Sequence, residues 1–195
     1  MNIANKTVLI TGANRGIGLA LVSEALVRGA ERVYAGVRGG GLDIADPRVT
    51  PLILDVTNAT QIARAIEQVG SLDLLVNNLS VVALAPVPVI PGYSISKAAA
   101  LNMTQALRAL LAGKGVSVHA VFLGPIDTDM NRGFDIPKAP TEVAARGIFD
   151  GLERGEEDIF PDPMSQSIAE GWRAGAAKAL ERQFAASVPQ SAAAA

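Results

Sequence analysis

One glycine-rich turn constrains the fold of this chain more than any other stretch of its sequence. Residues 11–18, Thr-Gly-Ala-Asn-Arg-Gly-Ile-Gly, follow an apolar segment at 7–10 and precede a helical pattern at 19–28. A helix that begins directly after a strand presents free backbone N–H groups and partial positive charge to an anion. Glycines in the turn let the backbone approach a pyrophosphate, which any Cβ would hold away. The spacing G-x-x-x-G-x-G differs slightly from the G-x-G-x-x-G fingerprint and predicts the same kind of dinucleotide site.

Further along the chain, segments of strand type alternate with segments of helical type. The expected strands lie at 32–37, 49–55, 72–78, 116–122 and 158–160, and the expected helices at 59–69, 93–112, 141–154 and 165–186. This alternation predicts a Rossmann-like, doubly wound parallel sheet of about six strands in a three-layer α/β/α arrangement. We expect one such domain over residues 1–188 and a disordered, Ala-rich tail at 189–195.

Polar or flexible residues stand at the carboxyl ends of the first four expected strands, namely Gly12, Arg38, Asp55 and Asn77. Ligands of doubly wound sheets bind beyond the carboxyl ends of the strands. The dinucleotide site is therefore expected to extend along this edge. Each polar residue also has a plainer interpretation: Arg38 as a solvated charge and Asp55 as a helix-cap residue.

Composition excludes several other classes of protein. Apolar residues make up 49% of the 195 residues and charged residues 18%, which is typical of a globular chain. The net charge of −2 gives no electrostatic case for nucleic acid or an anionic membrane, and the absence of cysteine excludes disulfides and thiol catalysis. The longest apolar region, 72–91, contains Asp, Asn and Pro and is not expected to span a membrane. The first strand follows the N-terminus too closely for a signal peptide, so we expect a cytoplasmic protein.

Several short motifs occur together with the glycine turn and in a fixed order. They are Asp55-Val56, Asn77-Asn78, Ser80, Tyr93-x-x-x-Lys97 and Gly124-Pro-Ile-Asp-Thr128. With these motifs the chain resembles the short-chain dehydrogenases/reductases over nearly its whole length. The resemblance implies an oxidoreductase that transfers hydride between a nicotinamide and a small-molecule carbonyl or alcohol.

Tyr93 and Lys97 are spaced for proton transfer. Residues four apart lie on one face of a helix. A phenol with a pKa near 10 is a poor acid or base at neutral pH, but a nearby ammonium group lowers that pKa. The resemblance implies that Tyr93 is the catalytic acid/base, that Lys97 tunes it and contacts the nicotinamide ribose, and that Ser80 holds the substrate oxygen. The plainer interpretation of Ser80 is a turn serine.

The expected cofactor site combines the glycine turn with the later motifs. Its candidate residues are Gly12, Asn14, Arg15, Gly16, Ile17, Gly18, Arg38, Asp55, Val56, Asn77, Tyr93, Lys97, Gly124, Ile126 and Thr128. The resemblance implies that Ile126 lies against the nicotinamide and that Thr128 binds its carboxamide. The second expected strand is followed by Arg38, and the position holds no carboxylate. An arginine there accommodates the 2′-phosphate of NADP(H), and Arg15 in the glycine turn can help to bind it. The sequence therefore predicts NADP(H) in preference to NAD(H). No metal site is expected, because Asp127 and Asp129 have no further ligands nearby.

The chain departs from the family between Asn78 and Tyr93, where only 14 residues intervene. A parallel crossover needs about a dozen residues plus its helix. We interpret this as the loss of one helix–strand unit between Asn78 and Ser80. Alternatively, the sequence omits residues that the molecule contains, and then the Cα atoms of Asn78 and Leu79 would not lie about 3.8 Å apart.

The missing unit affects what the protein can do. In the family this helix carries an asparagine that holds a proton-relay water, and it commonly builds the subunit interface. The alternative function is therefore a catalytically impaired nucleotide-binding scaffold with little or no turnover. A homo-oligomer is possible in either case, because the apolar residues of the 93–112 helix, Leu101, Met103, Leu107, Leu110 and Leu111, fit a core or an oligomer seam equally well. His119 is expected to be a buried, hydrogen-bonded core residue and Trp172 a packing residue.

Overall fold

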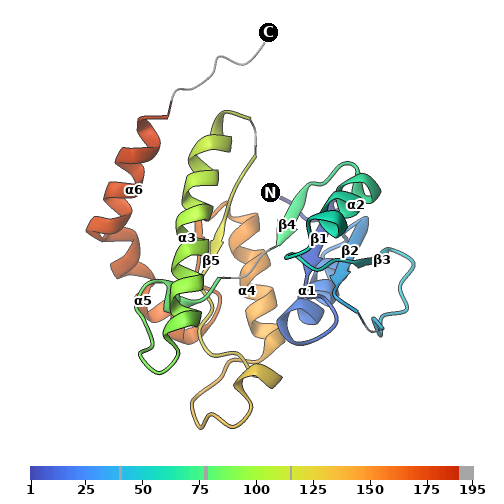
Figure 1. Cartoon of the computed structure of the whole chain (residues 1–195), viewed down its shortest axis with the longest axis horizontal. Helices are drawn as coiled ribbons and strands as arrows, with labels where there is room; N and C mark the ends of the chain where they lie inside the picture. Colours follow the sequence, from blue (N-terminus) through green and yellow to red (C-terminus); the bar gives the residue numbers. More distant parts are fainter. Residues whose placement is uncertain (40, 77–78, 115, 189–195) are drawn as a thin grey trace. The chain divides into compact units, whose positions relative to one another are not determined.

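The computed structural model describes residues 1–39, 41–76, 79–114 and 116–188, and Figure 1 gives the order of the elements. The chain divides into two compact units. Unit 1 comprises Met1–Asn77 and Pro125–Arg154, and unit 2 comprises Asn78–Gly124 and Gly155–Ala195. The expected single domain over 1–188 stays a prediction. The expected tail at 189–195 lies outside the described residues.

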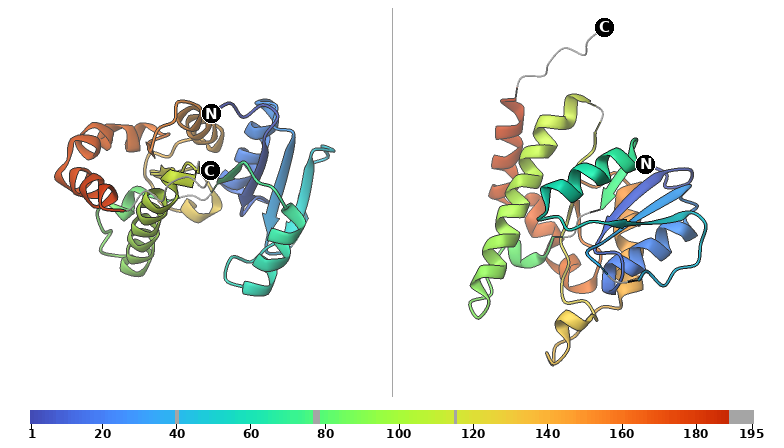
Figure 2. Two further views of the ribbon diagram at one scale, coloured as in Figure 1. Left: turned by 90° about the horizontal axis from the view of Figure 1, so that it is seen from above. Right: turned by 45° about the vertical axis from the view of Figure 1, so that its right-hand side comes forward.

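Unit 1 is built on a four-stranded parallel sheet whose strands lie side by side in Figure 2. The strands are β1 (Thr7–Thr11), β2 (Arg32–Val37), β3 (Val49–Ile53) and β4 (Leu74–Val76), in the order β3-β2-β1-β4. The register pairs Val8 with Val33 and with Leu74. Because β1 lies between two strands and is covered on both faces, its sequence is a continuous apolar run without alternation.

Helices bury both faces of this sheet. Alternate residues of a strand point to opposite faces. Leu9 packs with Ala65 of α2 (Ala59–Val69), whereas Val8 and Ile10 are fully buried on the other face. The helix α1 (Gly16–Val27) contacts β1 and β2 and packs along α4 (Thr141–Glu153). The order of parallel strands and covering helices confirms the Rossmann-like class.

A half-buried arginine ties the end of α1 to α4. The Arg28 guanidinium forms ion pairs with Glu24 at 2.8 Å, Asp150 at 2.5 Å and Glu153 at 2.7 Å. Its planar group also lies 5.7 Å from the centroid of the Phe149 ring. One side chain thus links the C-terminal ends of α1 and α4.

Unit 2 contains a long helix, a two-stranded parallel sheet and two C-terminal helices. Its elements are η1 (Val81–Ala83), α3 (Pro91–Leu111), η2 (Ala112–Lys114), β5 (Ala120–Val121), β6 (Asp158–Ile159), α5 (Pro163–Ala174) and α6 (Ala176–Ala186), with β5 paired to β6. Its core is centred on Phe122, which stacks on Phe160 at a centroid distance of 4.9 Å and contacts Trp172 at 5.6 Å. Trp172 is therefore a packing residue, as expected.

The strands are shorter than the sequence suggests. The expected strand at 72–78 is β4 (Leu74–Val76), with 77–78 outside the described residues, and the expected strand at 116–122 pairs only over β5 (Ala120–Val121). The six described strands pair as a sheet of four and a sheet of two. The expected single sheet of about six strands is therefore not formed by the described residues, in which β4 pairs with β1 and β5 pairs with β6.

The expected final helix at 165–186 is two helices. It begins earlier, at Pro163, because Asp162 caps α5, and it breaks at Gly175, whose backbone is extended at φ −75° and ψ 158°. A Cβ at Gly175 would lie 2.8 Å from the carbonyl oxygen of Gly171, so the break needs glycine. His119 also differs from expectation: it is half-buried, although its Nδ1 is hydrogen-bonded to the carbonyl oxygen of Glu156.

The apolar residues of α3 divide between core and surface. Leu101 is buried in the core of unit 2, whereas Met103, Leu107 and Leu110 are exposed. A homo-oligomer through this surface stays a prediction. Within the described part of the chain, no helix is both long and apolar enough to cross a membrane.

Candidate active site

The glycine turn has the geometry of an anion cradle. Gly12 and Gly16 have φ values of +66° and +53°, in the left-handed region that favours glycine. A Cβ at Gly18 would lie 2.1 Å from the carbonyl oxygen of Gly12, so the close packing of helix on turn admits no side chain there. α1 begins at Gly16, and its N-cap residue Arg15 makes no side-chain capping bond. The Arg15 side chain therefore does not occupy the first N–H groups of α1, which can bind a ligand.

The segment 126–128 lies against this turn. A Cβ added to Gly16 would meet Thr128 Cγ2 at 3.2 Å. Ile126 is buried and forms an isolated bridge with Ala139, and the Asp127 N–H donates to the carbonyl oxygen of Ala139 at 2.9 Å. Two motifs more than a hundred residues apart are therefore held together within unit 1.

The other candidate residues of the turn differ in exposure. Asn14 and Ile17 are half-buried and Arg15 is exposed. Asn77 lies outside the described residues, as does the junction of Asn78 with Leu79.

Arg38 and Asp55 stand at the ends of neighbouring strands. The Asp55 carboxylate accepts hydrogen bonds from Thr57 N at 2.9 Å and Thr57 Oγ1 at 2.7 Å. These bonds, with a smaller contribution from the positive charge of Arg38, hold the pKa of Asp55 below its usual range. Arg38 and Val56 are exposed, and α2 is capped by Asn58 and not by Asp55. The exposed guanidinium at this edge is available to an anion.

Tyr93 and Lys97 come together in the first turns of α3, in unit 2. Lys97 Nζ lies 5.6 Å from the centroid of the Tyr93 ring, and the Tyr93 side chain is partly exposed at 36%. Partial burial lowers the pKa of Lys97 below its ordinary value. The one-face geometry expected from the spacing of four is present, with a cation against the face of the phenol.

Ser80 is buried at the N-cap of η1. Its Oγ donates to the carbonyl oxygen of Leu123 at 3.3 Å and accepts from Val82 N at 3.4 Å. The next residue along, Gly124, donates its N–H to Asp162 Oδ2 at 2.9 Å. A Cβ at Gly124 would lie 2.5 Å from Asp162 Oδ1, so a packing constraint accounts for this glycine. Sequence reasoning missed Asp162, although Asp-Pro-x-Ser before a helical pattern is a capping signal.

The candidate residues thus form two sets. The glycine turn, Arg38, Asp55, Val56, Ile126 and Thr128 belong to unit 1, whereas Ser80, Tyr93, Lys97 and Gly124 belong to unit 2. Each set is assembled within its own unit. That both sets meet on one cofactor stays a prediction.

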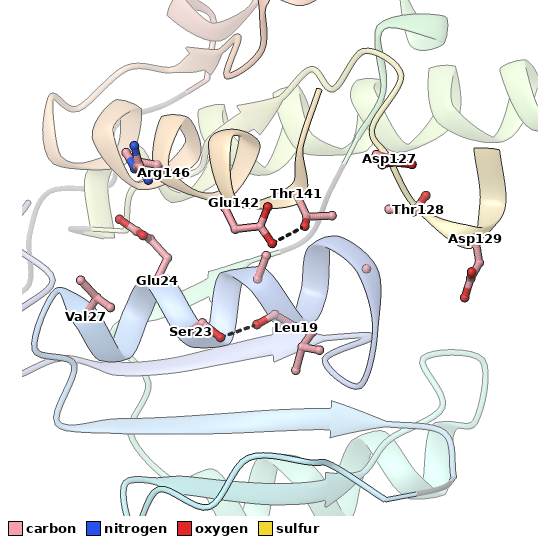
Figure 3. A pocket seen from close by; sticks show the side chains of 12 residues that line it. Leu19, Ser23, Glu24, Val27, Asp127, Thr128, Asp129, Thr141, Glu142 and Arg146 are labelled. Atoms are coloured by element: carbon pink, nitrogen blue, oxygen red, sulfur yellow. Dashed lines mark hydrogen bonds between the residues drawn. The ribbon is translucent and has the colours of Figure 1, made fainter. Parts of the chain in front are cut away.

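A cavity of about 580 Å³ lies beside the glycine turn in unit 1, between α1 and α4 (Figure 3). Leu19 and Ser23 of α1 and Thr141 and Glu142 of α4 are among the residues that line it. Its charged lining consists of Glu24, Asp127, Asp129, Glu142 and Arg146. Four carboxylates against one arginine repel an anion, so this cavity is not suited to a phosphate.

The parallel sheet order and the glycine turn define a Rossmann-like α/β protein. A sequence model of the family described as short chain dehydrogenase matches residues 6–81 and 79–138. The chain therefore belongs to the short-chain dehydrogenase family. The two matched pieces meet at 79–81, which is where the sequence predicts the missing helix–strand unit.

Individual relatives agree with this assignment. Sorbitol dehydrogenase of Cereibacter sphaeroides is 35% identical over 130 residues, which cover 58% of this chain and 50% of that protein. Galactitol 2-dehydrogenase of Agrobacterium fabrum is 33% identical over 116 residues, which cover 53% and 43%. The chain thus spans about half the length of these curated relatives or less. A short chain dehydrogenase from Burkholderia cenocepacia, solved in complex with NADP, has a TM-score of 0.84 at 32% identity, with 97% of this chain and 100% of that chain covered.

Proposed function

We propose that the protein is an NADP(H)-dependent oxidoreductase that interconverts a small-molecule carbonyl and its alcohol. The observation that carries the proposal is the Tyr93–Lys97 pair, in which a half-buried ammonium lies 5.6 Å from the phenol ring centroid. Lys97 thus supplies a cation and Tyr93 a transferable proton, four residues apart on one face of α3.

The cradle fits the proposed cofactor. The turn formed by Gly12, Gly16 and Gly18 would hold the pyrophosphate, because Gly12 and Gly16 have positive φ and the close packing at Gly18 brings the start of α1 against the turn. Ile126 and Thr128 lie beside the turn, where the nicotinamide is expected. Asn14, Arg15, Ile17, Asp55 and Val56 complete the proposed site on unit 1. When bound, the nicotinamide supplies or accepts the hydride.

The proposed proton transfer uses side chains of unit 2. In the direction of reduction, the Tyr93 hydroxyl donates its proton to the substrate oxygen as the carbonyl carbon is reduced. Lys97 stabilises the phenolate that remains, and in oxidation the same phenolate takes the proton back. Ser80 exchanges its hydrogen bond to the Leu123 carbonyl for one to the substrate oxygen, which fixes that oxygen for the transfer.

The proposed preference for NADP(H) depends on Arg38. This exposed guanidinium follows β2 directly, where NAD-preferring Rossmann enzymes carry a carboxylate. A guanidinium pairs well with a phosphate such as the 2′-phosphate of NADP(H). The similar Burkholderia cenocepacia protein was solved in complex with NADP, which supports the same preference here.

The proposal is tested by incubating the protein with NADPH and a panel of aldehydes and ketones. Turnover is measured as the loss of nicotinamide absorbance. We expect Tyr93→Phe to lower the rate by about a hundredfold or more, since general acid catalysis contributes that much. Ser96→Ala, which removes an exposed hydroxyl from the same part of α3, is the matched control for damage to the helix. Turnover that Tyr93→Phe leaves unchanged would exclude the proposed role.

The second candidate function is an impaired nucleotide-binding scaffold. It is favoured by the break in the family match at 79–81 and by the 14 residues that separate Asn78 from Tyr93. This function predicts NADPH binding by the wild-type protein without turnover of any substrate in the panel. The same assay therefore separates the two functions.

A further inference from the structure

Asp162 is a buried carboxylate outside the residues assigned so far. Its side chain is 1% exposed and lies at the junction of β6 and α5 in unit 2. Burial of a carboxylate is costly unless hydrogen bonds satisfy its oxygens. Asp162 Oδ1 accepts from Ser165 N at 3.1 Å, and Asp162 Oδ2 accepts from Gly124 N at 2.9 Å. One carboxylate thus joins the start of α5 to a residue 38 positions earlier.

The capping role alone does not account for both oxygens. An N-cap needs one side-chain acceptor for the N–H of the third helical residue, and Oδ1 supplies it. The second oxygen is directed at the backbone of Gly124, where a Cβ would come within 2.5 Å of Asp162 Oδ1. The close approach of carboxylate and backbone therefore fixes the position of the dipeptide Leu123–Gly124.

Ser80 is held to the same dipeptide from the other direction. The Leu123 carbonyl oxygen accepts from Val81 N at 2.9 Å and from Ser80 Oγ at 3.3 Å. The contacts form a chain from Asp162 through Gly124 and Leu123 to Ser80, all within unit 2. A displacement of Leu123–Gly124 would carry the Ser80 hydroxyl with it.

We infer that Asp162 is a positioning residue for the reaction, acting through Leu123–Gly124 on the hydroxyl of Ser80. The inference rests on the proposed function, in which Ser80 holds the substrate oxygen. A misplacement of about 1 Å at a reacting group can cost a hundredfold in rate. Loss of the Gly124 bond therefore lowers kcat more than it weakens the binding of NADPH, because the phosphates are assigned to the glycine turn of unit 1 even though Gly124 is itself a candidate cofactor contact.

Two variants separate positioning from helix capping. Asp162→Ser keeps one hydroxyl to cap α5 but leaves the Gly124 N–H without its acceptor. Ser165→Ala removes the other half of the capping box, in which Ser165 Oγ bonds the N–H and carbonyl of Asp162, and keeps the Gly124 bond. Both variants weaken the start of α5, so their thermal stabilities can be compared directly. Titration with NADPH gives the fraction of binding-competent protein, to which kcat is normalised.

For Asp162→Ser we expect kcat to fall at least tenfold, with the NADPH Kd within about twofold of the wild type. For Ser165→Ala we expect kcat within about twofold of the wild type. Amide hydrogen exchange gives a readout that needs no turnover: the N–H groups of Gly124 and Val81 should exchange faster in Asp162→Ser and not in Ser165→Ala.

Equal normalised kcat values in the two variants, or equal exchange of the Gly124 and Val81 amides, would overturn the inference. If the wild-type protein shows no turnover, the proposed function fails by itself. The exchange experiment then still decides whether Asp162 positions the Ser80 segment.

Discussion

At the scale of single residues, the glycines of this chain differ in whether the structure leaves room for a side chain. A Cβ at Gly18 would lie 2.1 Å from a backbone oxygen, whereas one at Gly171 of α5 meets nothing within 4 Å. Backbone atoms cannot move aside as a flexible side chain can. The glycine turn is therefore intolerant of substitution for steric reasons that are independent of any ligand.

These two glycines give a paired prediction. Gly18→Ala should displace the start of α1 from the turn, lower the free energy of unfolding by more than about 1 kcal/mol and weaken NADPH binding at least tenfold. Gly171→Ala should raise the free energy of unfolding by about 0.5–1 kcal/mol, because alanine favours a helix interior. Urea unfolding and NADPH titration measure both effects. A Gly18→Ala protein with wild-type affinity would contradict the assigned cradle.

Arg38 carries the prediction about cofactor choice. Arg38→Ala should weaken NADPH binding about tenfold and leave NADH binding within about twofold, because only NADPH has the 2′-phosphate. Fluorescence titration with the two nucleotides measures the difference, and Arg64→Ala on α2 is a suitable control for a general loss of positive charge. Equal weakening of both nucleotides would show that Arg38 does not read the 2′-phosphate.

At the scale of elements, a buried lysine attaches α6 to the rest of unit 2. Lys178 is 1% exposed, and its Nζ pairs with Asp158 at 2.8 Å, Glu181 at 3.0 Å and Glu157 at 3.0 Å. Arg108 of α3 pairs with Asp158 and Glu181 at 2.8 Å and 2.6 Å. Two cations and three carboxylates therefore join α3, β6 and α6.

This network also predicts a dependence of stability on pH. Burial by itself would raise the pKa of Asp158. The Lys178 hydrogen bond and the Arg108 charge nevertheless hold that pKa below its ordinary 3.8. Burial opposes the shift of Lys178 as well, but hydrogen bonds to Asp158 and Glu181 raise its pKa above 10.5. The stabilisation of the fold by Asp158 is thus present above pH 3.8 and is lost as the pH falls through the pKa of Asp158 in the folded protein. The stabilisation by Lys178 is present below pH 10.5 and is lost as the pH rises through the pKa of Lys178 in the folded protein.

Lys178→Met tests the network. Removal of one buried partner should cost about 3 kcal/mol of unfolding free energy at pH 7, since breaking a buried ion pair typically costs that much. The difference from wild type should shrink as the pH falls below 3.8 and Asp158 takes up a proton. Lys6→Met, which breaks the exposed pair of Lys6 with Asp73, is the control and should cost less than about 1 kcal/mol. A pH-independent loss would assign the effect to packing instead.

At the scale of the whole molecule, the candidate residues for the phosphates of the cofactor and those for proton transfer belong to different units. Arg38 and the glycine turn are parts of unit 1, and Tyr93 and Lys97 are parts of unit 2. If one cofactor joins them, binding and chemistry should respond to substitutions independently. Substitutions at sites that share no contacts have additive effects on free energy.

The double variant Arg38→Ala/Tyr93→Phe tests this arrangement. We expect the NADPH Kd of Tyr93→Phe to stay within about twofold of wild type and that of the double variant to match Arg38→Ala. NADPH at about a hundred times its Kd should also stabilise the protein by about 2.7 kcal/mol, measured as a rise in the thermal unfolding midpoint. A strong effect of Tyr93→Phe on Kd would show that the phenol hydroxyl contributes to nucleotide affinity, contrary to the expected independence.

The sequence by itself determined the Rossmann-like class, the glycine turn and the Tyr93–Lys97 pair, because each depends on local spacing along a strand, a turn or one helix face. The loss of one helix–strand unit between Asn78 and Ser80 stays a prediction, and the family match in two pieces that meet at 79–81 agrees with it. Motifs of this kind can be found one by one because each depends on short-range spacing.

Only the tertiary structure decided the pairing of strands into sheets of four and two, the break at Gly175 and the buried partners of Asp162 and Lys178. Lys178 reads as an ordinary exposed residue of an amphipathic helix, and Asp162 as a loop residue between a strand and a helix. Their roles depend on carboxylates, amides and strands that are distant in sequence. Such contacts arise from packing, and no local periodicity encodes them.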